Sequence, residues 1–325
     1  MVTIYNGAIK DEVDKRDYNI EEVGMFSPVE WVKKETVRSF EQKDQAQSSS
    51  CVANATAKIL AIENYLEEGR YFPLSARDIY SRRTNNSLGM NFREAMSIGK
   101  EYGITLESLM PSNGLSEALM NKVEDRTVFT EKTGEILKGG DFVSIPFNID
   151  AIASVINQGK GVLLGFLFDY SEWDLVVPKI SKDSVKSCHH GVAGIDYCLK
   201  DGKKAIVIDE SWGFKHITQR YLTEEWFSNN RITAAWYFED LSNIATPKIV
   251  LDNYQFNNNL YYGMRSDEVS ELQKVLMSLG LLNIREATGY FGSMTVNAVK
   301  EYQTINNITP VSGFFGPLTR ACMNK

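Results

Sequence analysis

A polar loop that ends in a thiol is the first stretch of the chain equipped for chemistry. Three serines precede Cys51. After it, Ala55, Ile59 and Ile62 fall on one face of a helical pattern. Cys51 is therefore predicted to lie at a helix N-terminus, where unpaired N–H groups and the helix dipole stabilise a thiolate. A nucleophilic cysteine needs that charge, but a buried inert thiol is the more ordinary fate of the residue. This loop alone leaves the two interpretations evenly balanced.

A cysteine nucleophile also needs a base, a group that orients the base, and a donor for the oxyanion. Two of the three histidines, His189 and His190, open an apolar β-rich segment. A second strand pattern runs up to Glu210, and the Asp201-Gly202 pair between the two strands is a strong hairpin signal. The hairpin brings the His190 end of one strand beside the Glu210 end of the next. A carboxylate there can accept a hydrogen bond from imidazole and fix its tautomer. The pattern does not identify which acidic residue orients the imidazole. The joint presence of a cysteine, a histidine and an acid still favours a catalytic function over a structural one.

The elements expected around these groups fall into two halves. The first hundred residues are predicted to be mainly helical, from Cys51 to about Gly69 and again over 76–82, capped by Ser75, and 91–102. The following part is rich in β-branched and aromatic residues, with short helices expected at 119–123 and 149–158. Strands are expected at 127–130, 142–145, 161–168, 190–199, 204–209 and 232–238. A helical half followed by a β-rich half indicates an α+β body of two subdomains with a cleft between them.

Composition narrows the possible function classes. At 325 residues the chain suits two or three domains, and 43% apolar with 24% charged residues is typical of a globular protein. A net charge of −7 without a Lys/Arg cluster argues against a nucleic-acid partner. No signal peptide opens the chain and no apolar run could span a bilayer, so we expect synthesis in the cytoplasm and no membrane insertion. Four scattered cysteines show no metal-ligand spacing, so no metal, cofactor or disulfide framework is expected.

The C-terminal part has a different texture. Residues 241–259 contain a proline and a polar run, which makes them the best linker candidate. Beyond them, apolar stripes over 269–279 and 294–302 predict two helices. The segment Gly289-Tyr-Phe-Gly-Ser-Met-Thr295 recurs 24 residues later as Gly313-Phe-Phe-Gly-Pro-Leu-Thr319. This repeat is too short for a solenoid and fits a small helical domain with two similar corners.

Three short sequence motifs of the first part of the chain occur in an order that is also found in a known family. They are Gln45 with Cys51, the segment His190-Gly-Val-Ala-Gly-Ile-Asp-Tyr197, and Glu210-Ser-Trp-Gly213. In this order they resemble the papain-like cysteine peptidases, with further similarity over 91–104. The resemblance covers roughly residues 15–240. It implies a papain-like fold with a helical and a β-barrel-like half, and a peptidase that hydrolyses peptide bonds.

The resemblance also implies a role for each matching residue. Cys51 would be the nucleophile, and His190 the general base that then protonates the leaving amine. The side-chain amide of Gln45 and the backbone N–H of Cys51 would form the oxyanion hole. Glu210 stands where the family usually has asparagine. Its carboxylate would orient the imidazole and raise the pKa of that ring.

The remaining site residues and the departures from the family come from the same comparison. Trp212 would shield the imidazole from water, while Gly89 and Met90 would lie along the substrate wall. Ala46 replaces a usual glycine, and Ser48 stands where many members have a disulfide-forming cysteine. The stretch before the nucleophile is shorter than the inhibitory prosegment of many relatives, so any latency would need another source.

The tail carries a second set of matching residues, dense in glycines and apolar positions. They include Tyr262-Gly263, Leu272-Gln273, Leu279-Gly280, Gly289, Gly292, Tyr302-Gln303, Gly313 and Gly316-Pro-Leu-Thr-Arg320. They resemble the peptidoglycan-binding domain of bacterial and phage wall hydrolases. The resemblance implies a three-helix module without chemistry of its own and peptidoglycan as its partner. Half of the four repeat aromatics are expected to fill its core, and an exposed one could stack on a sugar.

Four segments follow from this reading: an arm over 1–40, a peptidase domain over 41–245, a linker over 246–257 and a peptidoglycan-binding-like domain over 258–325. The favoured hypothesis is a cysteine peptidase brought to the bacterial cell wall by its tail. Without a signal peptide, it would act after lysis or as part of a bacteriophage virion. The alternative is an inactive papain-like fold that serves as a wall-binding or virion attachment protein. Protein and wall-peptide substrates both stay open at this point.

Overall fold

The computed structural model describes residues 7–12, 14, 27–85, 87–181, 188–213, 217–228, 231–239, 254–279, 281–282, 284 and 287–324. The chain forms two compact units, Met1–Asn243 and Ile244–Lys325. The predicted linker over 246–257 lies mostly outside the described residues, as does much of the predicted arm over 1–40.

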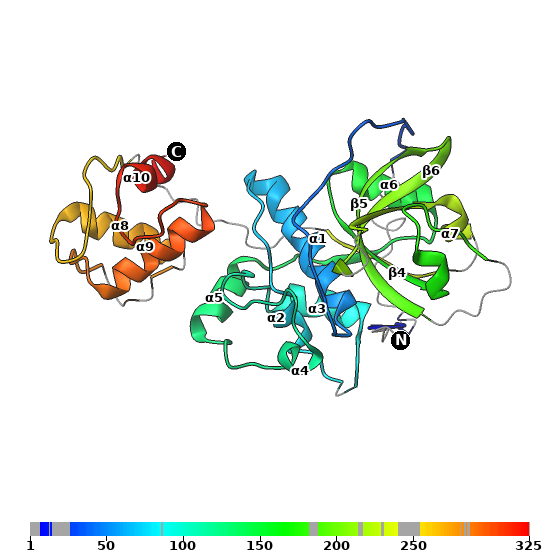
Figure 1. Ribbon diagram of the computed structural model, residues 1–325, viewed down its shortest axis with the longest axis horizontal. Coiled ribbons are helices and arrows are strands. Elements are labelled where there is room, and N and C mark those ends of the chain that lie inside the picture. The colour runs from blue at the N-terminus through cyan, green and yellow to red at the C-terminus, as the bar shows by residue number, and fades with distance from the viewer. Residues whose placement is uncertain are drawn as a thin grey trace. The chain divides into compact units, whose positions relative to one another are not determined.

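The first unit has a helical half built around one long helix, α1 (Cys51–Glu68). It ends at Gly69, whose φ of 66° is the left-handed conformation that glycine adopts without steric cost. Ser75 caps α2 (Ala76–Tyr80) by accepting the N–H of Asp78, as predicted. The other helices of this half are α3 (Phe92–Glu101), α4 (Glu117–Met120) and α5 (Val128–Ile136). In Figure 1, α1 lies between α2 and α3 on one side and β4 and β5 on the other.

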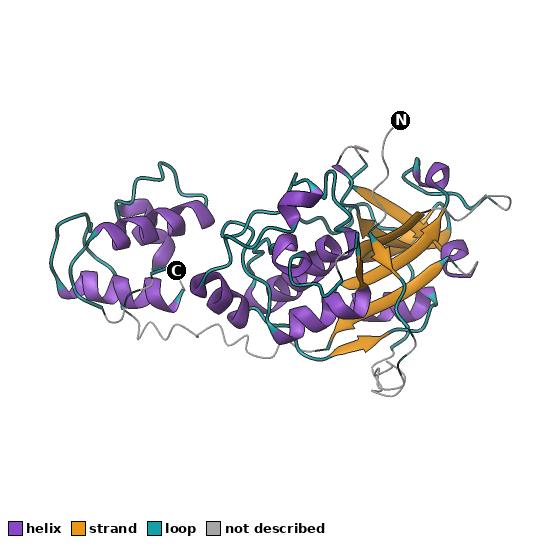
Figure 2. Cartoon of the chain, turned by 90° about the horizontal axis from the view of Figure 1, so that it is seen from below, coloured by secondary structure: helices purple, strands orange, loops and turns teal. Residues whose placement is uncertain are grey.

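An antiparallel sheet forms the second half, with strand order β3-β8-β4-β5-β6-β7 (Figure 2). The strands are β3 (Phe142–Ser144), β4 (Val162–Phe168), β5 (Cys188–Lys200), β6 (Lys203–Asp209), β7 (Gln219–Thr223) and β8 (Ile232–Phe238). β4 and β5 are buried along almost their whole length, because α1 and α6 (Ile149–Asn157) both pack against β5. Burial on both faces explains why their sequences read as apolar runs and do not alternate.

The β5–β6 hairpin fixes which residues stand near His190. Its turn is Asp201-Gly202, with φ of 51° and 77°, so the predicted hairpin is confirmed. A bulge shifts the register along the ladder, and the last pair sets Ala193 opposite Asp209. Glu210 therefore leaves the sheet at the end of β6, beside the start of β5.

The strand predicted at 127–130 is wrong, because this segment begins α5. Thr127 Oγ1 accepts the N–H of Thr130 at 3.3 Å, and Thr130 Oγ1 accepts the N–H of Thr127 at 2.8 Å. This reciprocal capping box satisfies two free donors at the helix start and outweighs the β preference of the threonines and valine. The sequence also fails to predict β7, the single-turn η1 (Tyr170–Trp173) and α7 (Glu224–Ser228).

Near the N-terminus, a short extended segment attaches to the helical half. β1 (Ala8–Ile9) pairs in parallel with β2 (Met90–Asn91), with Ala8 opposite Met90. The N–H of Met90 also donates to Gly7 O at 2.8 Å. Asp11 accepts the N–H of Arg93 at 3.1 Å, in the first turn of α3, where a negative charge is favourable.

Where the structure describes the second unit, it shows the predicted three helices, α8 (Asp267–Ser278), α9 (Ser293–Ile305) and α10 (Pro317–Met323). Of the four repeat aromatics, Phe291 and Phe315 are fully buried and Phe314 is 39% exposed. Two buried glutamines hold the repeated corners alike. The bonds are Gly289 N to Gln273 Oε1 (2.9 Å), Gln273 Nε2 to Tyr290 O (2.8 Å), Gly313 N to Gln303 Oε1 (2.9 Å) and Gln303 Nε2 to Phe314 O (2.8 Å).

Across the part of the chain that the structure describes, helices lack the combination of length and apolar character needed to cross a membrane.

Candidate active site

Cys51 is the first residue of α1, with Ser50 at the N-cap position. β5 approaches this helix start closely, since a Cβ added to Gly191 would lie 3.0 Å from Val52 Cγ2. Glycine at 191 thus lets the strand that carries His190 approach the helix that carries Cys51. Both of these side chains are fully buried.

His190 lies between the thiol and a carboxylate. Its Nε2 is 2.7 Å from Glu210 Oε1, and both side chains are fully buried. The other ring nitrogen, Nδ1, has no hydrogen-bond partner of standard geometry. It is the ring atom left for Cys51, whose side chain interacts with the imidazole. The structure therefore brings together the three groups that the sequence singled out.

The electrostatics of this buried pair favour the charged forms. Burial by itself would lower the pKa of His190, but the charge of Glu210 and then that of Cys51 raise this pKa above its usual range. Burial would likewise raise the pKa of Glu210, but His190 and Arg220 bring it below its usual range.

The neighbouring histidine has a different environment. His189 Nε2 lies 2.7 Å from Thr233 Oγ1. Burial, followed by the charge of His190, lowers the pKa of His189 to about 4. At neutral pH His189 is therefore uncharged. The third histidine, His216, lies outside the described residues.

Sequence reasoning missed the groups that hold the second oxygen of Glu210. Arg220 Nη1 lies 3.3 Å from Glu210 Oε2, and Trp173 Nε1 donates to the same oxygen. Both residues are fully buried, so this carboxylate compensates the positive charge of the buried guanidinium. They come from β7 and η1, two elements without a sequence signal.

Gln45 is anchored by the residue that follows Glu210. Its backbone N–H donates to Ser211 O at 2.9 Å, and its side-chain Oε1 accepts the hydroxyl of Ser211 at 2.8 Å. Gln45 Nε2 donates one of its two hydrogens to Ser48 O at 2.8 Å. The oxygen end of the amide is therefore fixed, and its nitrogen end points into the nucleophile loop (residues 45–51).

Trp212 stacks on His190, with ring centroids 4.1 Å apart and an interplanar angle of 27°. Trp212 is 2% exposed, so its ring covers the imidazole with apolar surface. The segment 210–212 thus contacts His190 through two of its side chains and Gln45 through the third.

The predicted substrate wall consists of Gly89 and Met90. The N-terminal segment lies between this wall and Cys51. A Cβ on Gly7 would be 2.8 Å from Cys51 Sγ and 2.0 Å from Ser49 O. A Cβ on Gly89 would be 2.4 Å from Gly7 O. Gly7 therefore occupies the space between the thiol and the wall and covers the sulfur. No pattern in the sequence predicts this contact.

The described residues contain no group of three histidine, cysteine, aspartate or glutamate side chains arranged to hold a metal ion.

Comparison with known proteins agrees with this geometry. The papain family of cysteine proteases matches residues 27–233, more than half of the chain. The chain therefore belongs to the papain family of cysteine proteases, and its first unit is a papain-like peptidase domain. A putative peptidoglycan binding domain matches residues 265–323, the region of α8 to α10. A comparison with curated proteins finds no match.

Solved structures show the same fold. Xylellain, a cysteine protease from Xylella fastidiosa, is 21% identical with a TM-score of 0.63 over 73% of this chain and 97% of that one. Digestive procathepsin L 3 of the Tenebrio molitor larval midgut is 18% identical, with a TM-score of 0.51 over 66% of this chain and 73% of that one. The proform of the ragweed allergen Amb a 11, a cysteine protease, is 17% identical with a TM-score of 0.51, and the match spans 62% of each chain. The predicted papain-like fold is confirmed.

Proposed function

We propose that this protein hydrolyses peptide bonds through Cys51, His190 and Glu210, and that its C-terminal module brings this activity to the bacterial cell wall. The observation that carries the proposal is one histidine buried between a thiol and a carboxylate. Its Nε2 lies 2.7 Å from Glu210 Oε1, and its Nδ1 is left for the sulfur.

The arrangement supports a two-stage reaction. The Cys51 thiolate attacks the carbonyl carbon of the scissile peptide bond, and the oxygen becomes an oxyanion. His190 gives its Nδ1 proton to the leaving amine as the C–N bond breaks, which leaves an acyl thioester on Cys51. Neutral His190 then takes a proton from water, the hydroxide attacks the thioester, and the C–S bond breaks to release the acid. Glu210 stabilises the imidazolium in both stages.

Two donors are available for the oxyanion. The backbone N–H of Cys51 lies in the first turn of α1, where it has no partner within the helix. The Gln45 amide has a second hydrogen beyond the one given to Ser48. Loss of one such donor typically costs about 100-fold to 1000-fold in kcat. Gln45→Ala should therefore lower kcat by that order while Cys51 is still alkylated.

The direct test digests casein and purified peptidoglycan in parallel and identifies the new chain ends by mass spectrometry. The variants are Cys51→Ala and, as a matched control, Cys198→Ala, which removes another buried free thiol. We expect new ends with the wild type and the control, and none with Cys51→Ala. Undiminished cleavage by Cys51→Ala would contradict the assignment. New ends from casein alone would rule out wall peptides as the substrate.

An inactive attachment protein is the other outcome of this test. It would give no new ends with the wild type, even after removal of the segment that covers Cys51. It would still bind peptidoglycan through the module.

A further inference from the structure

A chain of side-chain hydrogen bonds crosses from the nucleophile loop to the substrate wall. Glu117 Oε2 accepts the N–H of Ser49 at 2.7 Å, and Glu117 Oε1 accepts the hydroxyl of Tyr80 at 2.8 Å. The same hydroxyl accepts the N–H of Gly89 at 3.0 Å. Two backbone N–H groups, on either side of Gly7, are therefore joined through two side chains.

One extended segment, Gly7 and the start of β1, fits between these two backbone groups. Gly7 fits between them so closely that a Cβ would meet Ser49 O at 2.0 Å, and a Cβ on Gly89 would meet Gly7 O at 2.4 Å. The gap that Gly7 fills is the space beside Cys51 Sγ. The width of this gap therefore determines how an extended peptide lies against the nucleophile.

The two side chains of the bridge are well placed to hold that gap. Tyr80 is fully buried, and burial followed by its bond to Glu117 raises its pKa, so the hydroxyl keeps its proton and donates. The guanidinium of Arg83 lies 3.6 Å over the Tyr80 ring, and its Nη2 is 3.3 Å from Glu117 Oε1. A stacked and charge-paired arginine of this kind limits the movement of both partners.

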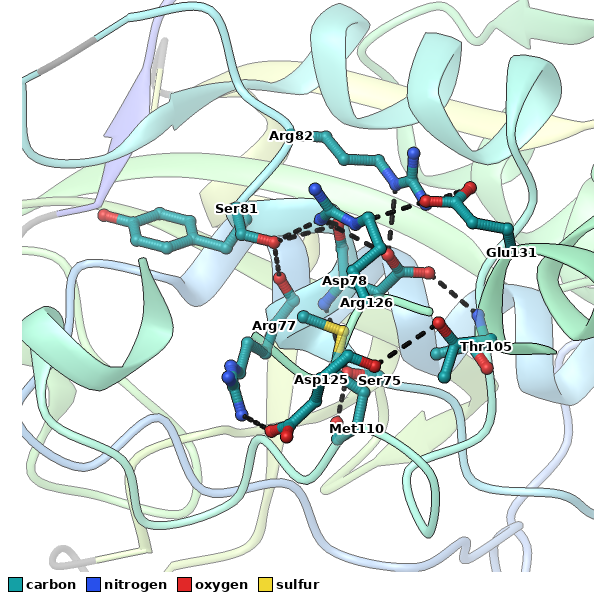
Figure 3. A network of polar contacts seen from close by, with 12 residues as sticks. Ser75, Arg77, Asp78, Ser81, Arg82, Thr105, Met110, Asp125, Arg126 and Glu131 are labelled. Atoms are coloured by element: carbon teal, nitrogen blue, oxygen red, sulfur yellow. Dashed lines mark hydrogen bonds and ion pairs between the residues drawn. The ribbon is translucent and has the colours of Figure 1, made fainter. Parts of the chain in front are cut away.

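The helix that carries Tyr80 is itself fixed. α2 has only five residues, too few to be stable alone. Figure 3 shows Asp78 of α2 at the centre of a polar network. Its Oδ1 accepts Arg82 Nε and its Oδ2 accepts the N–H of Thr105, each at 3.0 Å. Arg126 Nη2 donates to the carbonyl of Asp78 at 3.2 Å. The position of Tyr80 is therefore imposed by the surrounding helices and loops.

We propose that Tyr80 and Glu117 are positioning residues of the peptidase, which hold the nucleophile loop and the substrate wall at the separation that one extended peptide requires. Neither residue touches the reacting atoms. The proposal rests on the proposed function, in which Cys51 is the nucleophile and 89–90 is the wall. The four cysteines are free thiols, so no disulfide provides this link.

The two residues act on opposite sides of the gap and as one unit. Tyr80→Phe releases the N–H of Gly89 and should weaken substrate binding, with KM raised about tenfold, the effect of one unmade buried hydrogen bond. Glu117→Gln cannot accept both donors, because the amide nitrogen accepts none. It should lower kcat/KM by a similar factor. Because the bond between them is shared, the double variant should lose little more than the worse single variant.

The experiment measures kcat and KM on a soluble peptide, per active site titrated with an irreversible thiol inhibitor, with every variant also carrying Gly7→Val so that the N-terminal segment does not compete for the gap. The matched control is Tyr237→Phe, since Tyr237 also donates to a glutamate, Glu239 at 2.9 Å, but in the β-sheet half. Normalising to titrated sites removes the effect of any unfolded fraction. A purely structural role would then leave KM and kcat of Tyr80→Phe and Glu117→Gln at the control's values, and this result would overturn the proposal.

Amide hydrogen exchange on the full chain gives a second measurement that needs no activity. Tyr80→Phe should speed exchange at Gly89 about tenfold, and Glu117→Gln should do so at Ser49, while Tyr237→Phe changes neither. Unchanged exchange at both sites would overturn the bridge itself. A protein without peptidase activity even after removal of residues 1–14, or an active Cys51→Ala, would instead overturn the proposed function and leave this exchange result standing.

Discussion

The buried carboxylate of Glu210 contacts four nitrogen donors. Oε1 is 2.7 Å from His190 Nε2 and accepts the N–H of Ser211 at 2.9 Å, while Oε2 accepts Trp173 Nε1 and lies 3.3 Å from Arg220 Nη1. A carboxylate can accept all four contacts, whereas an amide has one accepting oxygen. This site is therefore built for a carboxylate, and the asparagine usual in the family would leave buried donors unpaired.

Replacing Glu210 by glutamine should shift the pH dependence of catalysis. The carboxylate raises the pKa of His190, so its removal lets the imidazolium lose its proton at lower pH. The alkaline limb of the kcat/KM profile, which reports this loss, should move down by about 1–2 pH units. Glu124→Gln, which removes a 67% exposed carboxylate, is the control and should leave the profile in place. An alkaline limb at the wild-type pH would contradict the role of the charge.

Ala46 stores strain in the nucleophile loop. Its φ is 44°, a left-handed conformation that costs a residue with a Cβ roughly 1–2 kcal/mol. Ala46→Gly should therefore raise the free energy of unfolding by about 0.5–1 kcal/mol, after the extra backbone entropy of glycine in the unfolded chain. Ala61→Gly, in the interior of α1, should lower it by about 1 kcal/mol or more. Denaturant unfolding of the two variants would show these opposite signs, and a destabilised Ala46→Gly would contradict the argument.

At the scale of elements, one short segment contacts both the base and the oxyanion donor of the candidate site. Residues 210–212 leave β6 and contact His190 through Glu210 and Trp212, and Gln45 through Ser211. The β5–β6 hairpin places this segment, because its register ends with Ala193 opposite Asp209. A shift of one residue would turn Glu210 to the other side and separate it from the imidazole.

The N-terminal segment at Gly7–Ile9 should restrict access to Cys51. Gly7 covers the sulfur, and Ala8 pairs with the wall at Met90. Removing residues 1–14 should therefore speed alkylation of Cys51 by iodoacetamide at least about tenfold, if the segment is held by even one buried hydrogen bond. Site-resolved mass spectrometry would measure the rate.

A point variant provides the control for that deletion. Gly7→Val keeps the chain length but cannot dock, because its Cβ would meet Ser49 O at 2.0 Å. Cys51 of this variant should be alkylated as fast as Cys51 of the deletion. Cys198, which lies on β5, should keep its wild-type alkylation rate in both proteins. Equal labelling of Cys51 in all three proteins would show that the segment does not restrict the thiol.

Elements with a strong local sequence pattern could be predicted from the sequence. The contacts that the shortest elements make could not. The start of α1 and the Asp201-Gly202 hairpin follow from helix periodicity and turn chemistry, and the hairpin places Glu210 beside His190. The approach of Cys51 to His190 depends on the packing of α1 against β5. Trp173 and Arg220 lie on elements of four and five residues, which are too short to show a period. Tyr80 lies on a short helix that the Ser75 cap predicts, but the cap does not predict what the side chain contacts. Their partners are distant in sequence, so only the tertiary fold reveals them.

At the scale of the whole molecule, the chain joins a peptidase with its own core to a binding module with its own core. All contacts of the candidate site described above lie within Met1–Asn243. The buried glutamines and the apolar cluster of α8 to α10 lie within the second unit. Catalysis and wall binding should therefore be separable by cutting between the units.

Removing the second unit should make that separation measurable. A chain that ends at Asn243 should hydrolyse soluble casein with kcat/KM within about twofold of the full chain, because every residue assigned to the candidate site lies within the first unit. It should no longer sediment with purified peptidoglycan, whereas full-length Cys51→Ala should. On casein fixed to peptidoglycan, the full chain should be faster by roughly 100-fold or more, since binding raises its effective concentration at the surface. The soluble casein rate controls for folding of the truncated protein. If the truncated chain sediments as well as the full one, wall binding does not belong to the module.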